Sequence, residues 1–81
     1  MIRVAVLTIS DSCAAGVRED ASGPAVAHIC ESQGWAVVHR DVLPDEHGQI
    51  QARLRGLANA GAANVILTTG GTGIAARDTT P

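Results

Sequence analysis

Residues 68–73, Thr-Thr-Gly-Gly-Thr-Gly, are the part of the sequence best suited to binding chemistry. They directly follow an apolar run, Val65-Ile66-Leu67, and are followed by Arg77 and Asp78. Glycine lets another molecule approach the backbone closely, and successive N–H groups in such a turn form a concave nest that binds anions. The stretch therefore predicts a cradle for a phosphate or another oxygen-rich anion. A tight strand-to-helix turn would explain the same residues without a ligand.

The elements that must position this stretch follow from the hydrophobic pattern. Apolar runs predict buried strands, and apolar residues at i, i+4, i+7 and i+8 predict helices with one buried face. Glycine stops the helices at Gly34 and Gly61, and Ser22 with Pro24 suits the start of the first helix. The predicted order is β-α-β-α-β: strand 2–9, a helix from about residue 22, strand 35–43, helix 50–58 and strand 64–69.

Alternation of strands and helices predicts an α/β fold with a parallel sheet. With strand order 2-1-3, one helix covers each face, and strands 1 and 3 meet at a topological switch point where ligands bind. The second strand is polar in its middle, at His39, Arg40 and Asp41, which places it near the sheet edge. Three polar loops follow the strands and should share one edge of the sheet: Ser10-Asp11-Ser12, Pro44-Asp45-Glu46 and Thr69 to Gly73.

Composition excludes several classes of protein. The chain has 81 residues, a formal net charge of -2 and no lysine, so it cannot form the lysine-containing phosphate loop of P-loop NTPases. It has no basic cluster for nucleic acid, and no apolar run approaches the roughly 20 residues of a membrane span. Its two cysteines suit a reducing cytoplasm, which we expect as its location.

A dinucleotide-binding domain is the obvious competitor. Its glycine fingerprint belongs in the turn after the first strand, where this chain reads Ser-Asp-Ser-Cys-Ala-Ala-Gly with one glycine. The glycine cluster follows the third strand instead, which argues against nicotinamide-dependent chemistry.

The motifs together resemble the MoaB/Mog family of molybdenum cofactor biosynthesis proteins. The pattern combines Thr8 to Ser12, Asp20 with Ser22-Gly23-Pro24, Pro44-Asp45-Glu46, Thr69 to Gly73, and Arg77-Asp78-x-Thr80-Pro81. The resemblance covers residues 1–81. The family domain is roughly twice as long, so we expect residues 1–81 to form its N-terminal portion.

The resemblance implies a three-layer α/β/α fold, a homotrimer at full length, and work alongside other molybdenum cofactor biosynthesis proteins. It implies binding of molybdopterin and its adenylylation by ATP with Mg²⁺. The catalytic, magnesium-binding aspartates fall on Asp45 and Asp78. The substrate-binding residues fall on Ser10, Asp11, Gly70, Gly71, Thr72 and Gly73, with Arg77 available to neutralise phosphate charge.

Ordinary structural explanations exist for these side chains. Asp45 suits a turn, Asp78 a helix cap, Asp11 a bond to its own loop, and Arg77 a surface ion pair. Two alternatives to the enzyme stay open: a pterin-binding or assembly module without catalysis, and an inactive fragment. For the fragment we expect an exposed apolar edge at residues 65–67, with aggregation or a broad unfolding transition.

Overall fold

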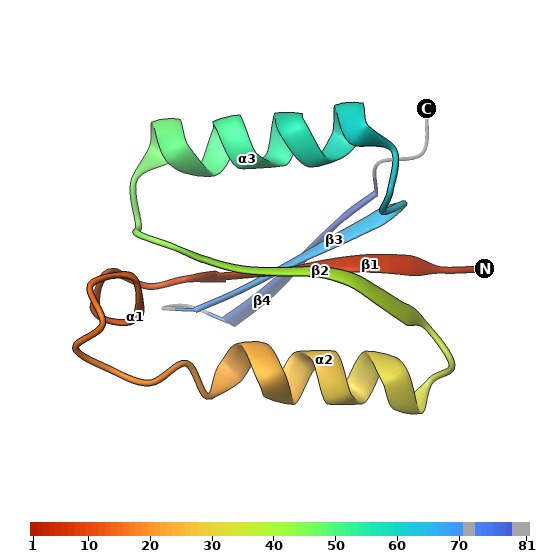
Figure 1. The fold of residues 1–81 in the computed structure, drawn as a ribbon, viewed down its shortest axis with the longest axis horizontal. Helices are drawn as coiled ribbons and strands as arrows, with labels where there is room; N and C mark the ends of the chain where they lie inside the picture. The colour runs from red at the N-terminus through yellow and green to blue at the C-terminus, as the bar shows by residue number, and fades with distance from the viewer. Residues whose placement is uncertain (71–72, 79–81) are drawn as a thin grey trace.

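A central sheet of four strands carries one long helix on each face. The computed structural model describes residues 1–70 with their side chains and the backbone of residues 73–78. The strands are β1 (Arg3–Ile9), β2 (Ala36–Leu43), β3 (Val65–Gly70) and β4 (Gly73–Asp78), and the helices are α1 (Asp11–Ala14), α2 (Ser22–Ser32) and α3 (His47–Ala60). Figure 1 shows α2 and α3 on opposite sides of the sheet, which makes the fold three-layered.

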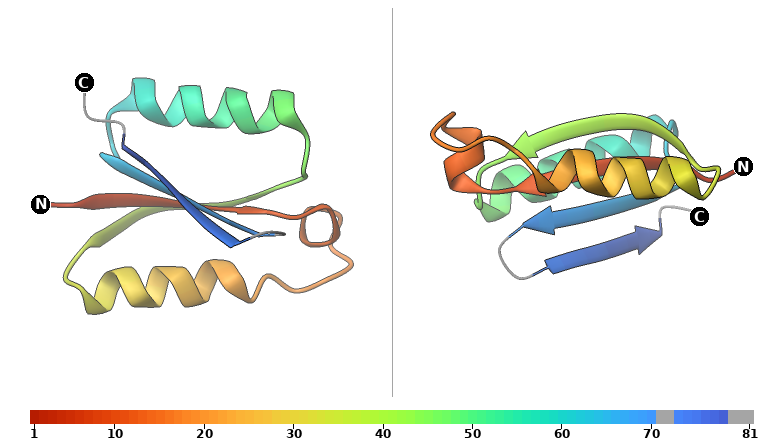
Figure 2. Two further views of the ribbon diagram at one scale, coloured as in Figure 1. Left: turned by 180° about the vertical axis from the view of Figure 1, so that it is seen from behind. Right: turned by 90° about the horizontal axis from the view of Figure 1, so that it is seen from below.

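The sheet order is β2-β1-β3-β4, and β1 pairs in parallel with both β2 and β3. This confirms the predicted order 2-1-3 and the position of β2 at an edge. β4 was not predicted: it returns antiparallel along β3, from Gly70 opposite Gly73 to Val65 opposite Asp78 (Figure 2). The prediction that β3 exposes its edge at residues 65–67 is therefore wrong, because β4 pairs with that edge.

β1 forms the centre of the core because its side chains supply both faces of the sheet. Ala5 and Leu7 join Leu43, Ala63 and Ile66 on the α3 side. Val4 and Val6 join Val26 and Cys30 on the α2 side. Trp35 packs against this second cluster. The buried apolar run is thus explained by a strand covered on both faces.

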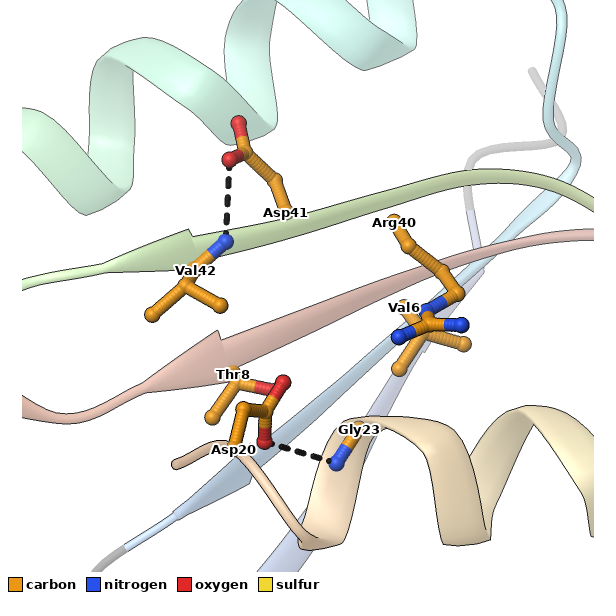
Figure 3. A pocket seen from close by; sticks show the side chains of 7 residues that line it. All are labelled: Val6, Thr8, Asp20, Gly23, Arg40, Asp41 and Val42. Atoms are coloured by element: carbon orange, nitrogen blue, oxygen red, sulfur yellow. Dashed lines mark hydrogen bonds between the residues drawn. The ribbon is translucent and has the colours of Figure 1, made fainter. Parts of the chain in front are cut away.

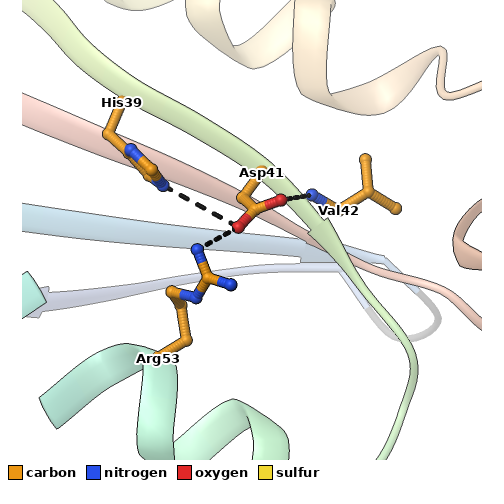
Figure 4. Close-up of polar contacts among 4 residues, drawn as sticks. All are labelled: His39, Asp41, Val42 and Arg53. Carbon is orange, nitrogen blue, oxygen red and sulfur yellow. Dashed lines mark hydrogen bonds and ion pairs between the residues drawn. The ribbon is translucent and has the colours of Figure 1, made fainter. Parts of the chain in front are cut away.

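The edge strand β2 contains a register shift beside Val38. Val4 pairs with Val37, but Ala5 pairs with His39, so Val38 is the extra residue of a β-bulge. The shift places His39 and Asp41 on the face of Ala5 and Leu7, which α3 covers. There Asp41 forms an ion pair with Arg53 of α3 and accepts a hydrogen bond from its own neighbour, Val42 N–H (Figure 4).

Two of the predicted helix boundaries need correction. Residues 11–14, expected as a loop, form the single turn α1 with Ser10 as its N-cap. Ser22 lies inside α2 rather than capping it, and the carboxylate of Asp20 accepts the Gly23 N–H instead, at 3.0 Å. The predicted stops are confirmed: Gly34 and Gly61 both have positive φ. No helix among residues 1–70 and 73–78 is long and apolar enough to cross a membrane.

Candidate functional site

The carboxyl ends of β1, β2 and β3 meet at one edge of the sheet, as the predicted parallel order requires. Ser10 follows β1 and donates its backbone N–H to the Leu43 carbonyl at 2.8 Å, which joins the ends of β1 and β2. Gly70 ends β3 beside Ile9. This edge therefore gathers three of the predicted loops, those that contain Ser10, Asp45 and Gly70.

Asp11 and Asp45, predicted separately, are in direct contact. The Asp45 N–H donates to Asp11 Oδ1 at 2.9 Å, across 34 positions of sequence. Both residues are exposed. The Asp11 carboxylate therefore holds the loop that follows β2, a contact beyond the bond to its own loop that the sequence suggested.

Gly70 occupies a position that only glycine fits. Its φ is 129°, and an added Cβ would collide with the carbonyl oxygen of Ile9. Close approach of β3 to the end of β1 thus explains this glycine by itself.

A cavity of about 360 Å³ lies beside Gly70, between the end of β1 and the segment that leads into α2. It is lined by Ser10 and Gly70, which were predicted as binding residues, and by residues that were not, including Thr8, Arg18, Asp20 and Ser22. We call this the edge cavity. Arg18 forms no ion pair with another residue in the described part of the chain, so its charge is available to an anionic ligand.

Asp20 organises the wall of the edge cavity. Thr8 Oγ1 donates to Asp20 Oδ2 at 3.0 Å, and the Gly23 N–H donates to Asp20 Oδ1, as Figure 3 shows for the second bond. A side chain at position 23 would collide with the Asp20 carboxylate and with Thr8 Oγ1. Asp20 therefore ties the buried end of β1 to the start of α2. It was visible in the sequence only as part of the Asp-x-Ser-Gly-Pro pattern.

A second cavity, also of about 360 Å³, lies on the other side of this wall. Thr8 and Asp20 line both cavities, and Val6, Arg40 and Val42 line the second one (Figure 3). The Thr8–Asp20 bond thus separates the edge cavity from a hollow on the α2 face of the sheet.

The structure does not bring Asp78 to the carboxyl edge. Because β4 runs antiparallel to β3, Asp78 pairs with Val65 at the opposite end, and Arg77 pairs with Ile66. Gly73 pairs with Gly70 and so stays at the edge. Gly71 and Thr72, the centre of the predicted cradle, lie outside the described residues. The predicted roles of Asp78, Arg77, Gly71 and Thr72 stay predictions.

The residues at the edge have the donor chemistry that Mg²⁺ requires. Asp11 and Asp45 present exposed carboxylates, and Mg²⁺ is usually held by one or two carboxylates together with substrate phosphates. Within the described part of the chain, no three His, Cys, Asp or Glu side chains form a ready-made metal cluster. The donor set fits a metal that arrives with a phosphate ligand, not a metal bound by protein groups alone.

Glu46 fixes the far side of the Asp45 loop. Its carboxylate accepts the N–H groups of Gly48 and Gln49 at 3.0 and 2.8 Å and caps α3. These two bonds hold the pKa of Glu46 below its ordinary value. The loop between β2 and α3 is therefore anchored twice, by the bond from Asp45 N–H to Asp11 and by the Glu46 cap.

Fold and site together define a three-layer α/β domain with a cavity at the carboxyl edge of its sheet. Residues 5–81 match the family model described as "Probable molybdopterin binding domain". The chain belongs to this family of molybdopterin-binding domains.

Named relatives agree with that assignment. The chain is 43% identical over 81 residues to the molybdenum cofactor synthesis protein cinnamon of Drosophila melanogaster, covering 99% of this chain and 14% of that protein. It is 40% identical over 75 residues to molybdopterin adenylyltransferase of Pyrococcus furiosus, covering 93% of this chain and 43% of that protein. The crystal structure of the molybdopterin biosynthesis enzyme MoaB from Thermus thermophilus superposes with a TM-score of 0.82 at 36% identity, covering 93% of this chain and 47% of that one. The chain thus spans less than half the length of these relatives.

Proposed function

We propose that this chain binds molybdopterin at the carboxyl edge of the sheet and serves molybdenum cofactor biosynthesis. The observation that carries the proposal is the edge cavity, where Ser10, Arg18 and Gly70 meet in a domain of the molybdopterin-binding family. A hydroxyl, a guanidinium that forms no ion pair among the described residues, and a glycine backbone suit a phosphate group. Gly71, Thr72 and Gly73 complete the proposed cradle through the motif.

The finer proposal is that the bound phosphate is adenylylated. An oxygen of the molybdopterin phosphate attacks the α-phosphorus of ATP, a new P–O bond forms, and pyrophosphate leaves. The protein must hold the molybdopterin phosphate and the ATP triphosphate in line. The two anions repel each other, and positive groups offset that repulsion. Mg²⁺, when bound, supplies charge neutralisation at the phosphates. Asp45 would hold it. Arg18 lines the edge cavity, and Arg77 is proposed from the sequence motif alone.

Asp78 enters this proposal through the sequence motif alone. In the structure its backbone pairs with Val65, at the end of β3 that lies away from the carboxyl edge. Asp45 is thus supported by its place in the structure and Asp78 by the sequence motif alone, so each aspartate is substituted separately. The homotrimer, the cytoplasmic location and the other biosynthetic partners are likewise proposals drawn from the resemblance.

A second candidate function is a pterin-binding or assembly module without catalysis. The observation that favours it is the separation of Asp45 from Asp78, since a metal pair needs both carboxylates at one place. Such a module would bind molybdopterin and would not turn over ATP.

Pyrophosphate release separates these functions when molybdopterin, ATP and Mg²⁺ are supplied together. For the transferase we expect release in the wild type, and a loss of about a hundredfold or more in Asp45→Ala and in Asp78→Ala, with molybdopterin affinity retained. Glu31→Gln, at an exposed carboxylate in the last turns of α2, is the matched control and should leave release unchanged. Binding without release indicates the module, and absence of both binding and release rejects the proposed function.

A further inference from the structure

Asp11 lies where two loops of the proposed site meet. Its backbone begins α1, whose N-cap Ser10 is fixed to β2 by the bond from Ser10 N–H to the Leu43 carbonyl. Its Oδ1 accepts the Asp45 N–H at 2.9 Å. The Asp11 carboxylate is therefore held on the end of the sheet and faces the loop that follows β2.

Asp45 has no other fixed support of this kind among the described residues. Pro44, which precedes it, has no N–H to donate. The next donor, Glu46 N–H, turns back to the Pro44 carbonyl at 2.8 Å and so stays inside the loop. The Asp45 N–H is the group through which this loop contacts α1, and Asp11 is its acceptor.

We propose that Asp11 is a positioning residue that acts through Asp45 instead of contacting the substrate phosphates. This inference rests on the proposed function, in which Asp45 serves the reacting phosphates. A carboxylate repels a phosphate unless a cation lies between them, and one oxygen of Asp11 is already engaged. Small displacements of a group at a reacting centre lower turnover strongly, so an acceptor that fixes the Asp45 backbone has a clear use.

A purely structural role for Asp11 is the competing explanation. Both aspartates are exposed, and an exposed hydrogen bond is readily exchanged for one to water. Loss of the bond should therefore move the Asp45 loop while leaving the rest of the fold intact.

The test compares Asp11→Ala with Asp11→Asn in the whole chain, with Ser12→Ala as a matched control at an exposed neighbour. Asparagine keeps a carbonyl oxygen that can accept the Asp45 N–H but carries no charge. By NMR we expect hydrogen exchange of the Asp45 amide to accelerate about tenfold in Asp11→Ala and to stay near the wild-type rate in the other two variants. Unchanged exchange in Asp11→Ala would overturn the proposal.

The rate of pyrophosphate release is the second measurement that tests the proposal. We expect Asp11→Ala to lower kcat for pyrophosphate release about tenfold with KM for molybdopterin unchanged, and Asp11→Asn to restore it. Equal loss in both variants, with the Asp45 amide still protected in Asp11→Asn, would mean that the charge itself contacts the reactants and would overturn the proposal. If the wild type releases no pyrophosphate, the proposed transferase function fails, while amide exchange still decides whether Asp11 positions Asp45.

Discussion

At the scale of single residues, glycine is required at the switch point for a local geometric reason. Gly70 combines a φ of 129° with an approach to the Ile9 carbonyl that leaves no room for a Cβ. Gly56, in the middle of α3, has nothing within 4 Å of the position that its Cβ would take. A methyl group would therefore collide with the backbone at position 70 and meet open space at position 56.

Gly70→Ala and Gly56→Ala should change stability in opposite directions. We expect Gly70→Ala to lower the free energy of unfolding by about 2 kcal/mol or more, from backbone strain and collision with Ile9. Gly56→Ala should raise it by about 0.5–1 kcal/mol, because alanine is the better helix former. Urea unfolding of both variants measures this difference, and equal effects would contradict the close approach of β3 to β1.

At the same scale, some residues of the carboxyl edge could be predicted from the sequence and others could not. Ser10, Asp11, Asp45 and Gly70 were predicted as site residues because each lies at the end of an apolar strand or soon after it, and the structure places them at one edge of the sheet. Asp20 was not assigned a role, since Asp20 and Ser22 are both good helix-capping residues and only the path of the loop decides between them. The contact between Asp11 and Asp45 joins positions 34 apart, and no local pattern encodes it.

At the scale of elements, α3 is held by a capped first turn, an ion pair and partial burial of its apolar face. None of its residues is fully buried, although Leu54 and Leu57 pack against the core. Glu46 caps its first turn through two backbone bonds, and Arg53 pairs with Asp41 on β2 (Figure 4). The cap should therefore have a measurable influence on the helix that follows the Asp45 loop.

The Glu46 cap predicts a defined pH dependence. Its pKa is lowered in the folded chain from an ordinary value of 4.5, so the unfolded chain binds more protons between the two values. Stability from this group is then fully present above about pH 4.5 and is lost as the pH falls through the lower, folded value.

Glu46→Gln should flatten the fall in stability below about pH 4.5, measured as the difference from wild type in urea unfolding at several pH values. Glu31→Gln removes an exposed carboxylate from α2 and serves as the control. A wild-type curve that Glu46→Gln leaves unchanged would mean that the cap does not form in solution.

Most elements were predicted correctly because burial leaves a regular apolar pattern in the sequence. A strand buried on both faces gives an apolar run, and a helix buried on one face gives apolar residues at helical spacing. β1 was recognisable from an unbroken apolar run, and α3 from apolar positions one helical turn apart. β4 was not, because residues 73–78 contain glycine, arginine and aspartate, and their pairing is supplied by the edge of β3. The bulge at Val38 was also hidden, since two adjacent valines give no sign of which one the register omits.

At the scale of the whole molecule, β2 is an outer strand that carries a bulge and charged side chains. No strand in the described part of the chain pairs with its outer side. A bulge and charged side chains are common protections for such edges. Val38 is 44% exposed at the bulge, and Arg40 follows it on the α2 face.

Arg40→Val should weaken this protection. It replaces a charge by a β-branched residue and gives β2 a longer apolar stretch, so we expect association to begin at a lower protein concentration. Light scattering against concentration measures the onset, with Arg55→Val on α3 as a control of equal charge change. The same onset in both variants would show that the β2 edge does not govern association.

The central claim is that molybdopterin binds at the carboxyl edge of β1, β2 and β3. Its most direct test is a titration of the isotopically labelled chain with molybdopterin under anaerobic conditions, followed by the backbone amide signals. We expect saturable shifts concentrated at Ser10, Asp11, Arg18, Asp45 and Gly70, with the exposed side of α3 unaffected. Saturable shifts centred on α3 or at the amino ends of the strands, or no shifts at all, would contradict it.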